Sequence, residues 1–407
     1  MLNALLVLED ATIYPGIGFG AEPLSINELD PAVTRHKGVG EVVFNTAMSG
    51  YHEVLTDPSY TGQLVVMTYP HIGNYGTDPG WSETGPETDA RRSGVKAAGF
   101  VVRARYDGPP PDGRSRLSEL LQTHETPAIT DVDTRALTLH LRDNGSRRGV
   151  IVRAPQGLMR WTHQPAAMLQ QDQLDRVLSF LAAFPDMQGR NLIGEVGSSE
   201  PTVVNPGGKP HIALLDCGTK ANIVRELQAL GCRLTILPSR ANESDVRAAA
   251  ADALLISNGP GDPAVLSAQI ETVRRCIGSM PVLGICLGHQ LIAEAIGART
   301  FKMKFGHHGA NHPVRDEDSG RVFVTSQNHG FSVEEASLPE GVRVWFRNAN
   351  DQSVEGIRND AMGLASAQFH PESAPGPNDS RWIFAAFLDL VRTANPGGAD
   401  AGQTGSA

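Results

Sequence analysis

The residue best suited to covalent chemistry is a cysteine flanked by glycines. Cys286 stands in PVLGICLG (281–288), with Gly284 and Gly288 two positions to either side and a helical pattern after it. This spacing is typical of a nucleophile elbow, here with cysteine in place of serine, in which a sharp strand-to-helix turn exposes the central side chain. The first N–H groups of the following helix would favour a thiolate and stabilise an oxyanion. Taken alone, the motif fits a buried structural cysteine in a glycine-flanked turn equally well.

A nucleophilic cysteine needs a base, and the base needs an orienting group. The run FHPE (369–372) supplies both, because Pro371 disfavours a helical conformation at His370 and leaves the chain extended. In an extended chain the side chains of His370 and Glu372 point the same way, so the carboxylate can hold the imidazole. An isolated His-Pro-Glu is more often a surface turn, but its combination with the cysteine motif favours a catalytic pair.

A third motif, NGPGDP (258–263), follows the apolar run 253–257. Gly259 and Gly261 permit close approach of the backbone to a ligand, and a backbone N–H in this turn could complete an oxyanion hole. An ordinary Gly-Pro turn explains the same residues, so this motif indicates a functional site only in combination with the other two motifs.

The elements that must position these motifs alternate regularly in the second half of the chain. Apolar runs of strand length are separated by helical patterns, which is typical of a doubly wound parallel sheet. We expect the run 361–369 to be the strand that delivers His370 and Glu372. The other predicted strands are 211–215, 233–237, 253–257 and 281–285, and the predicted helices are 220–230, 244–251 and 263–277.

The first half is less regular, and we predict a mixed β/α domain for it. Strand-like runs at 4–8, 41–45 and 63–68 are broken by Gly, Pro and Asn clusters, while helical spacing marks 133–143 and 168–184. The predicted fold class is therefore α/β, with two domains. The predicted boundaries are 1–196 for the N-terminal domain with its connecting segment, 197–210 for a linker, 211–394 for the doubly wound domain and 395–407 for a disordered tail.

Composition excludes several classes of function. The 407 residues are 40% hydrophobic and 20% charged, with a formal net charge of −10, as in ordinary globular proteins. An acidic chain without a basic run is a poor candidate for binding nucleic acid or an anionic membrane. The apolar stretches fall far short of the roughly 20 residues of a membrane span. The N-terminal run MLNALLVLED predicts a first strand rather than a signal peptide.

Cysteine and histidine usage argues against disulfides and metals. The four cysteines include no C-x-x-C pair, so we expect neither a disulfide framework nor a thiolate zinc site in this protein. This cysteine usage predicts that the protein resides in the reducing cytoplasm. His307, His308 and His312 lie among glycines without nearby carboxylates on a helical face, so we expect no metal there but a loop at a domain or subunit interface. No G-x-x-x-x-G-K-[ST] loop is present, so no ATP site is recognisable in the sequence.

Together, GICLGHQ, QFHPE and NGPGDP resemble the class I (triad) glutamine amidotransferases, on elements of the expected type. The resemblance extends over nearly the whole chain to the family of carbamoyl-phosphate synthase small subunits. It rests on GEVVFNTAMSGYHEVLTDPSY (40–60), TYPHIGNYG (68–76), FGHHGANHP (305–313) and TSQNHGF (325–331), of which the first two lie in a domain that other glutamine amidotransferases lack. Departures are small: Cys217 stands where the family often has an aromatic residue, and Ala47 where serine is familiar.

The resemblance implies a Cys-His-Glu triad: Cys286 as nucleophile, His370 as general base and acid, and Glu372 as the carboxylate that orients it. It also implies a glutamine pocket, to which Ser59 of the first domain would contribute across the domain interface. The other pocket residues would be Gly259, Gly261, Leu287, Gln290, Asn328, Gly330 and Phe331.

The function implied by the resemblance is hydrolysis of L-glutamine to glutamate and ammonia. A large synthetase subunit would use the ammonia, with bicarbonate and ATP, to make carbamoyl phosphate for pyrimidine and arginine biosynthesis. This chain would hold no cofactor, and MgATP would bind the large subunit. Two alternatives are the glutaminase component of another amidotransferase, which the N-terminal domain argues against, and a non-catalytic glutamine-binding scaffold, which the intact triad argues against.

Overall fold

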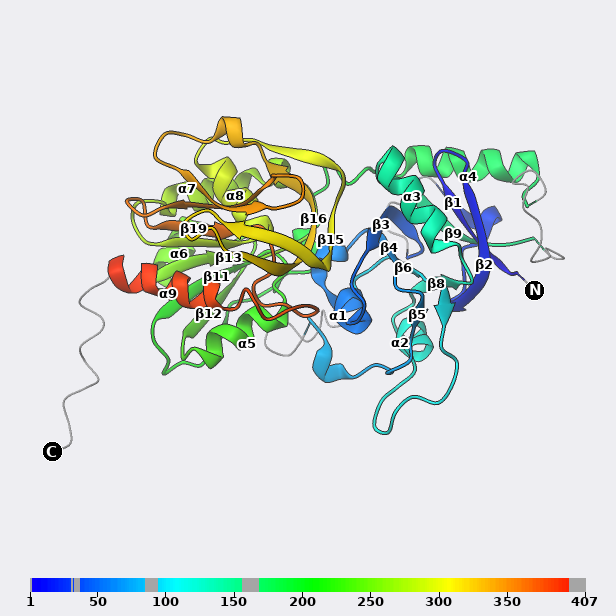
Figure 1. The fold of residues 1–407 in the computed structure, drawn as a ribbon, viewed down its shortest axis with the longest axis horizontal. Coiled ribbons are helices and arrows are strands. Elements are labelled where there is room, and N and C mark those ends of the chain that lie inside the picture. Colours follow the sequence, from blue (N-terminus) through cyan, green and yellow to red (C-terminus); the bar gives the residue numbers. More distant parts are fainter. Residues whose placement is uncertain (1, 31, 33–36, 85–93, 156–167, 395–407) are drawn as a thin grey trace. The chain divides into compact units, whose positions relative to one another are not determined.

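The computed structural model describes residues 2–30, 32, 37–84, 94–155 and 168–394, and the predicted tail 395–407 lies outside them. The chain divides into two compact units, each with its own sheet and hydrophobic clusters (Figure 1). Unit 1 comprises Met1–Glu83, Gly94–Arg190 and Lys304–Gly309. Unit 2 comprises Thr84–Ser93, Asn191–Met303 and Ala310–Ala407.

Unit 1 is built on a closed barrel in the strand order β1-β2-β8-β6-β4-β3-β9. Closing the sheet leaves no free edge strand. Pairing is parallel from β3 through β4 and β6 to β8 and antiparallel elsewhere. The strands are β1 (Ala4–Leu8), β2 (Ile13–Gly20), β3 (Val39–Asn45), β4 (Gln63–Met67), β6 (Gly99–Val101), β8 (Pro127–Thr130) and β9 (Arg147–Arg153), and a two-stranded sheet pairs β5 (His71–Ile72) with β7 (Ala104–Arg105).

Strand β1 of the barrel buries both faces, because its alternate residues enter different clusters. In β1, Leu6 packs with Leu137 of a neighbouring helix, whereas Leu5 and Val7 pack with Val177 and Phe180 of another. Val177 and Phe180 lie three positions apart on their helix, which is the spacing of residues on one buried helix face. The helices of unit 1 are α1 (Tyr51–Thr56), α2 (Leu117–Thr123), α3 (Thr134–Asn144) and α4 (Gln171–Ala183). The mixed β/α prediction is confirmed, whereas closure into a barrel was not foreseen.

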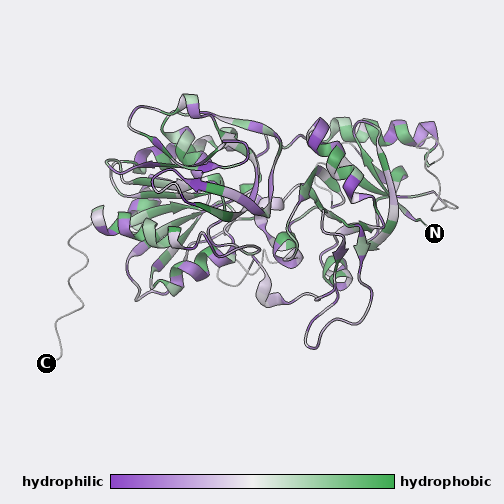
Figure 2. Cartoon of the chain, viewed as in Figure 1, coloured by the Kyte–Doolittle hydropathy of each residue, from purple (hydrophilic) through white to green (hydrophobic). Residues whose placement is uncertain are grey.

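Unit 2 carries a ten-stranded sheet in the order β10-β12-β11-β13-β14-β19-β18-β17-β15-β16. The five strands from β12 to β19 are parallel, and they bear largely hydrophobic residues (Figure 2). Their bounds are β11 (His211–Asp216), β12 (Arg233–Pro238), β13 (Ala253–Ile256), β14 (Val282–Ile285) and β19 (Leu364–Ala367). The other strands are β10 (Thr202–Val204), β15 (Thr300–Asp316), β16 (Val322–Val333), β17 (Arg343–Asn348) and β18 (Val354–Asn359).

Helices cover both faces of the parallel strands, as the doubly wound prediction requires. On one face, Ile212 of β11 shares a cluster with α5 and α9, and on the other, Ala213 shares a cluster with α6, α7 and α8. The helices are α5 (Ala221–Ala229), α6 (Glu243–Ala248), α7 (Ser267–Cys276), α8 (Leu287–Ala295) and α9 (Trp382–Ala394). None of the helices that the structure describes is long and apolar enough to span a membrane.

The structure corrects three expectations about the second half. The loop expected around His307, His308 and His312 is wrong, because all three belong to the 17-residue strand β15. The segment 197–210, expected to be a linker, contributes β10, which pairs with β12 at one edge of the sheet. The strand expected over 361–369 spans only Leu364–Ala367. His370 and Glu372 therefore lie beyond the carboxyl end of the strand and not directly at it.

Candidate active site

Cys286 occupies the turn between β14 and α8 in a strained conformation. Its φ and ψ are 54° and −105°, so a non-glycine residue sits at positive φ, which costs energy that the surrounding structure must offset. Its N–H donates to the Ala367 carbonyl (2.8 Å), and its own carbonyl accepts from Gln290 N–H (3.2 Å) at the start of α8. The sulfur lies 3.6 Å from the Asn328 carbonyl oxygen. The predicted elbow geometry is therefore present.

The flanking glycines of the elbow are required by close packing. A Cβ at Gly284 would lie 2.6 Å from the carbonyl carbon of Gly288, and a Cβ at Gly288 would lie 2.2 Å from the Ile256 oxygen. Both distances are shorter than any real Cβ contact with backbone, so a side chain at either position would push α8 away from β13 and β14.

His370 and Glu372 make the contact that their spacing predicts. His370 Nδ1 lies 2.6 Å from Glu372 Oε1, and both side chains are buried. Because the carboxylate accepts, Nδ1 carries a proton and Nε2 remains for chemistry. Nε2 is buried and has no hydrogen-bond partner of ordinary geometry among the described residues, although Cys286 contributes electrostatically to the pKa of this imidazole.

A buried lysine completes the arrangement. Lys220 Nζ lies 3.0 Å from Glu372 Oε1 and donates to the Ser373 carbonyl, while the Lys220 N–H donates to Asn258 Oδ1 (3.0 Å). Asn222 Nδ2 donates to the Glu372 carbonyl. Lys220 thus ties the carboxylate to the NGPGDP turn. Sequence reasoning missed it, because a lysine preceding an amphipathic helix is indistinguishable by pattern from a solvated one.

Opposite charges set the protonation of this cluster. Burial disfavours the charged imidazole, but the negative charges of Glu372 and Cys286 outweigh burial and raise the pKa of His370 to about 10. Burial likewise opposes ionisation of Glu372, but Lys220 and His370 together lower its pKa to about 2. At neutral pH the base is an imidazolium held by a carboxylate, which is the partner that a catalytic thiolate needs.

The structure brings most of the expected pocket residues around the elbow. A Cβ at Gly259 would lie 2.9 Å from Leu287 Cδ2, and Gly261, after β13, has a left-handed φ of 100°. Asn328 contacts Cys286 through its carbonyl. Gly330 leaves room for Lys302, whose Nζ lies 4.9 Å from the centroid of the adjacent Phe331 ring.

Ser59 belongs to unit 1, in the 3-10 helix Pro58–Tyr60. Its N–H donates to Asp57 Oδ1 (2.9 Å), which fixes the turn that carries it. Its expected contribution to the glutamine pocket stays a prediction.

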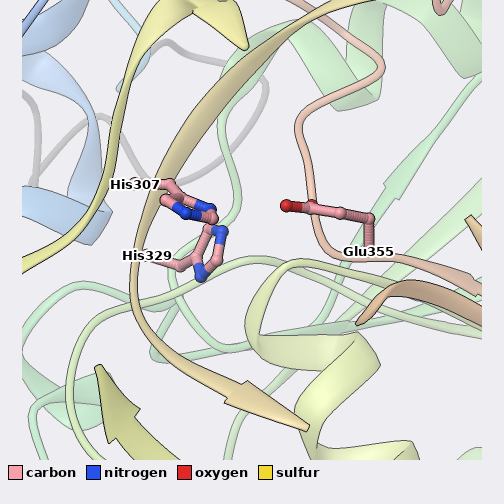
Figure 3. Close-up of side chains that lie close together, drawn as sticks. All are labelled: His307, His329 and Glu355. Carbon is pink, nitrogen blue, oxygen red and sulfur yellow. The ribbon is translucent and has the colours of Figure 1, made fainter. Parts of the chain in front are cut away.

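A buried polar network joins β16 to β18 and reaches the backbone of Phe331. Figure 3 shows His329 of β16 and Glu355 of β18. Gln327 links them: its Nε2 donates to Glu355 Oε2 (2.9 Å), and its Oε1 faces His329 Nε2 (2.9 Å). His329 Nδ1 faces the Phe331 carbonyl (2.8 Å). Both ring nitrogens of His329 therefore lie within hydrogen-bond distance of an oxygen, and the network holds the Phe331 carbonyl in place.

Two family models match the chain in sequence order. The model described as Carbamoyl-phosphate synthase small chain, CPSase domain, matches residues 6–151, and the model described as Glutamine amidotransferase class-I matches residues 213–390. The first therefore covers most of the barrel of unit 1, and the second covers Cys286, His370, Glu372 and nearly all of the parallel strands of unit 2.

Curated relatives match over nearly the full length. The carbamoyl phosphate synthase small chain of Methanococcus maripaludis (strain C5) is 41% identical over 395 residues, covering 96% of this chain and 97% of the relative. Those of Chlorobaculum tepidum and Vibrio cholerae are each 40% identical, over 402 and 413 residues, covering 96% of this chain and 98% of the relative. The chain therefore belongs to the family of carbamoyl phosphate synthase small chains, with a class-I glutamine amidotransferase domain in its second half.

Proposed function

We propose that this chain hydrolyses L-glutamine with Cys286, His370 and Glu372 as its catalytic triad. The observation that carries the proposal is the buried His370–Glu372 contact of 2.6 Å, in the same unit as a cysteine strained at a strand-to-helix elbow. A base fixed by a carboxylate and a nucleophile fixed at a helix start are the two parts that covalent amide hydrolysis requires.

The reaction follows from the charges of the site. The Cys286 thiolate attacks the side-chain amide carbon of glutamine, and the resulting tetrahedral oxyanion accepts hydrogen bonds from the N–H groups of Leu287 and Gly261. His370 Nε2–H protonates the leaving nitrogen, so the C–N bond breaks and ammonia departs. The neutral His370 then takes a proton from water, which attacks the γ-glutamyl thioester and releases glutamate and the thiolate. Gly259, Gln290, Asn328, Gly330 and Phe331 hold the substrate.

Ammonia released in this way needs a consumer. The relatives are named small chains of carbamoyl phosphate synthase, which supports a large synthetase subunit as the partner in a heterodimer. That subunit would bind MgATP and combine the ammonia with bicarbonate into carbamoyl phosphate, for pyrimidine and arginine biosynthesis in the cytoplasm. This chain itself needs no cofactor for the glutaminase half-reaction, because the triad supplies both nucleophile and proton transfer.

The test is carbamoyl phosphate formation with a cognate large subunit, bicarbonate and MgATP, comparing glutamine with ammonium as nitrogen donor. The wild type is expected to support both donors, and Cys286→Ala only ammonium. Cys276→Ala is the matched control, because Cys276 is buried in α7 and belongs to a different hydrophobic cluster from Cys286. Glutamate release without carbamoyl phosphate would reject the partner but not the triad. Glutamine use by Cys286→Ala would reject the triad.

A further inference from the structure

Both amide protons of Gln290 are committed within the protein. Gln290 Nε2 donates to the Phe331 carbonyl (2.9 Å) and to Gln368 Oε1 (3.0 Å). A backbone carbonyl can only accept, so the Gln290 atom facing Phe331 must be nitrogen. The side-chain oxygen is thus the one polar atom of this amide left for a ligand, and no other group of the described residues bonds to it. A ligand that binds against this oxygen must present a donor to it.

Gln368 is the residue that completes this arrangement. It lies just beyond β19, two positions before His370, and its side chain is fully buried. Its N–H donates to the Glu355 carbonyl (2.7 Å), which fixes the backbone against β18. Since Gln290 presents nitrogen, Gln368 must present oxygen, and the orientation of both amides follows from the single carbonyl of Phe331.

We propose that Gln368 is a positioning residue that locks the Gln290 amide with its oxygen toward the α-ammonium group of glutamine. The inference rests on the proposed function and deepens it, because it assigns how the site recognises an α-amino acid amide. With one anchor, at Phe331, the Gln290 amide could rotate about that hydrogen bond. The second anchor, at Gln368, fixes the direction of the oxygen.

The burial of Gln368 argues against a purely structural role. Its Nε2 is buried without a hydrogen-bond partner among the residues that the structure describes. Leaving a buried donor unpaired is unfavourable, so an apolar residue of the same shape would suit the fold at least as well. What an apolar residue cannot supply is the acceptor oxygen that Gln290 uses.

The first experiment separates binding from chemistry in the intact complex. Gln368→Met removes the acceptor at nearly constant volume and is expected to raise KM for glutamine about tenfold with kcat unchanged, since the ammonium is bound equally in ground and transition states. Gln368→Glu keeps an acceptor oxygen and is expected to leave KM unraised. Gln269→Met is the matched control, because Gln269 is a buried glutamine on α7 whose side-chain amide donates to the Ser239 carbonyl.

The second experiment asks whether the effect depends on the substrate ammonium. Glutaramate, which is glutamine without its α-amino group, should be a poor substrate of the wild type. Gln368→Met should lower the ratio of kcat/KM for glutamine over glutaramate about tenfold. Adding Gln368→Met to Gln290→Ala should change this ratio no further, because the two residues act through one oxygen.

The outcomes are distinguishable. An equal loss of kcat/KM for glutamine and glutaramate in Gln368→Met, or a KM raised as much by Gln368→Glu as by Gln368→Met, overturns the inference and leaves the proposed function standing. A wild-type complex that does not hydrolyse glutamine overturns both. Thermal unfolding of each variant is measured alongside, and an unchanged melting temperature with a raised KM supports the positioning role.

Discussion

Lys220 and Glu372 form an ion pair that is shielded from solvent. Lys220 Nζ lies 3.0 Å from Glu372 Oε1, and the two side chains are 1% and 0% exposed. Glu372 also binds His370, so one carboxylate holds two cations. Burial opposes ionisation of Glu372, but Lys220 and His370 together lower its pKa to about 2. Lys220 therefore keeps ionised the carboxylate that orients the imidazole.

Replacing Lys220 by methionine should impair both stability and activity. Removing one partner of a buried pair typically costs about 3–5 kcal/mol of unfolding free energy, and Glu372, which orients His370, would lose one of its two cationic partners. We expect a lower kcat/KM for glutamine hydrolysis and a lower urea midpoint. Lys304→Met is the control, because the Lys304 side chain is exposed. If Lys220→Met unfolds at the wild-type urea concentration, the pair is not stabilising.

The stability of the triad should depend on pH in two windows. The pKa of His370 is raised from 6.5 to about 10, so its contribution is fully present below pH 6.5 and is lost as the pH rises toward 10. The pKa of Glu372 is lowered from 4.5 to about 2, so its contribution is present above pH 4.5 and is lost as the pH falls toward 2. The free energy of unfolding, measured by urea titration, should decline in both windows. In His370→Gln the alkaline decline should be weaker, and an unchanged alkaline slope would contradict the assignment.

Alkylation should single out one of the four cysteines. Burial raises the pKa of the Cys217 and Cys276 thiols, and it raises the pKa of Cys232 to about 11. Cys286 instead occupies the strand-to-helix elbow at the start of α8, and helix N-termini are typical environments of reactive cysteines. Iodoacetamide at pH 7 should therefore label Cys286 first, and glutamine should slow the reaction. Peptide mass spectrometry locates the label, and Cys286→Ala should show none under the same conditions. Preferential labelling of Cys217 would argue against an activated Cys286.

Gly288 should tolerate no side chain. Because the added Cβ would lie 2.2 Å from the Ile256 oxygen, Gly288→Ala should displace α8 and destabilise the protein by about 1–3 kcal/mol. We also expect glutaminase kcat to fall by more than the loss of unfolding free energy alone would explain, because the nucleophile moves with the helix. Gly207→Ala is the control, because a Cβ there meets nothing within 4 Å. Wild-type kcat in Gly288→Ala would show that the elbow can relax without cost to catalysis.

Much of the fold and of the triad followed from local patterns. The strand-and-helix series from 211 onward was predicted and is observed. It was predictable because the spacing of apolar residues over a few positions indicates the type of each element. The His370–Glu372 contact was predictable for the same reason, since an extended chain fixes how residues two apart face. The barrel of unit 1 was not predicted, because closure depends on pairing between β1 and β9, which are far apart in the chain.

The sequence by itself determined the residues on which the proposed chemistry rests: a cysteine at an elbow, a histidine with its carboxylate, and an α/β framework to carry them. Only the tertiary structure decided which ordinary polar residues serve that chemistry. Lys220 reaches Glu372, and Gln290 reaches Gln368, across long separations in sequence. A buried charge or amide is tolerable only where partners converge on it from several elements. That convergence leaves no periodic signal along the chain, so it becomes visible only once the strands and helices are packed.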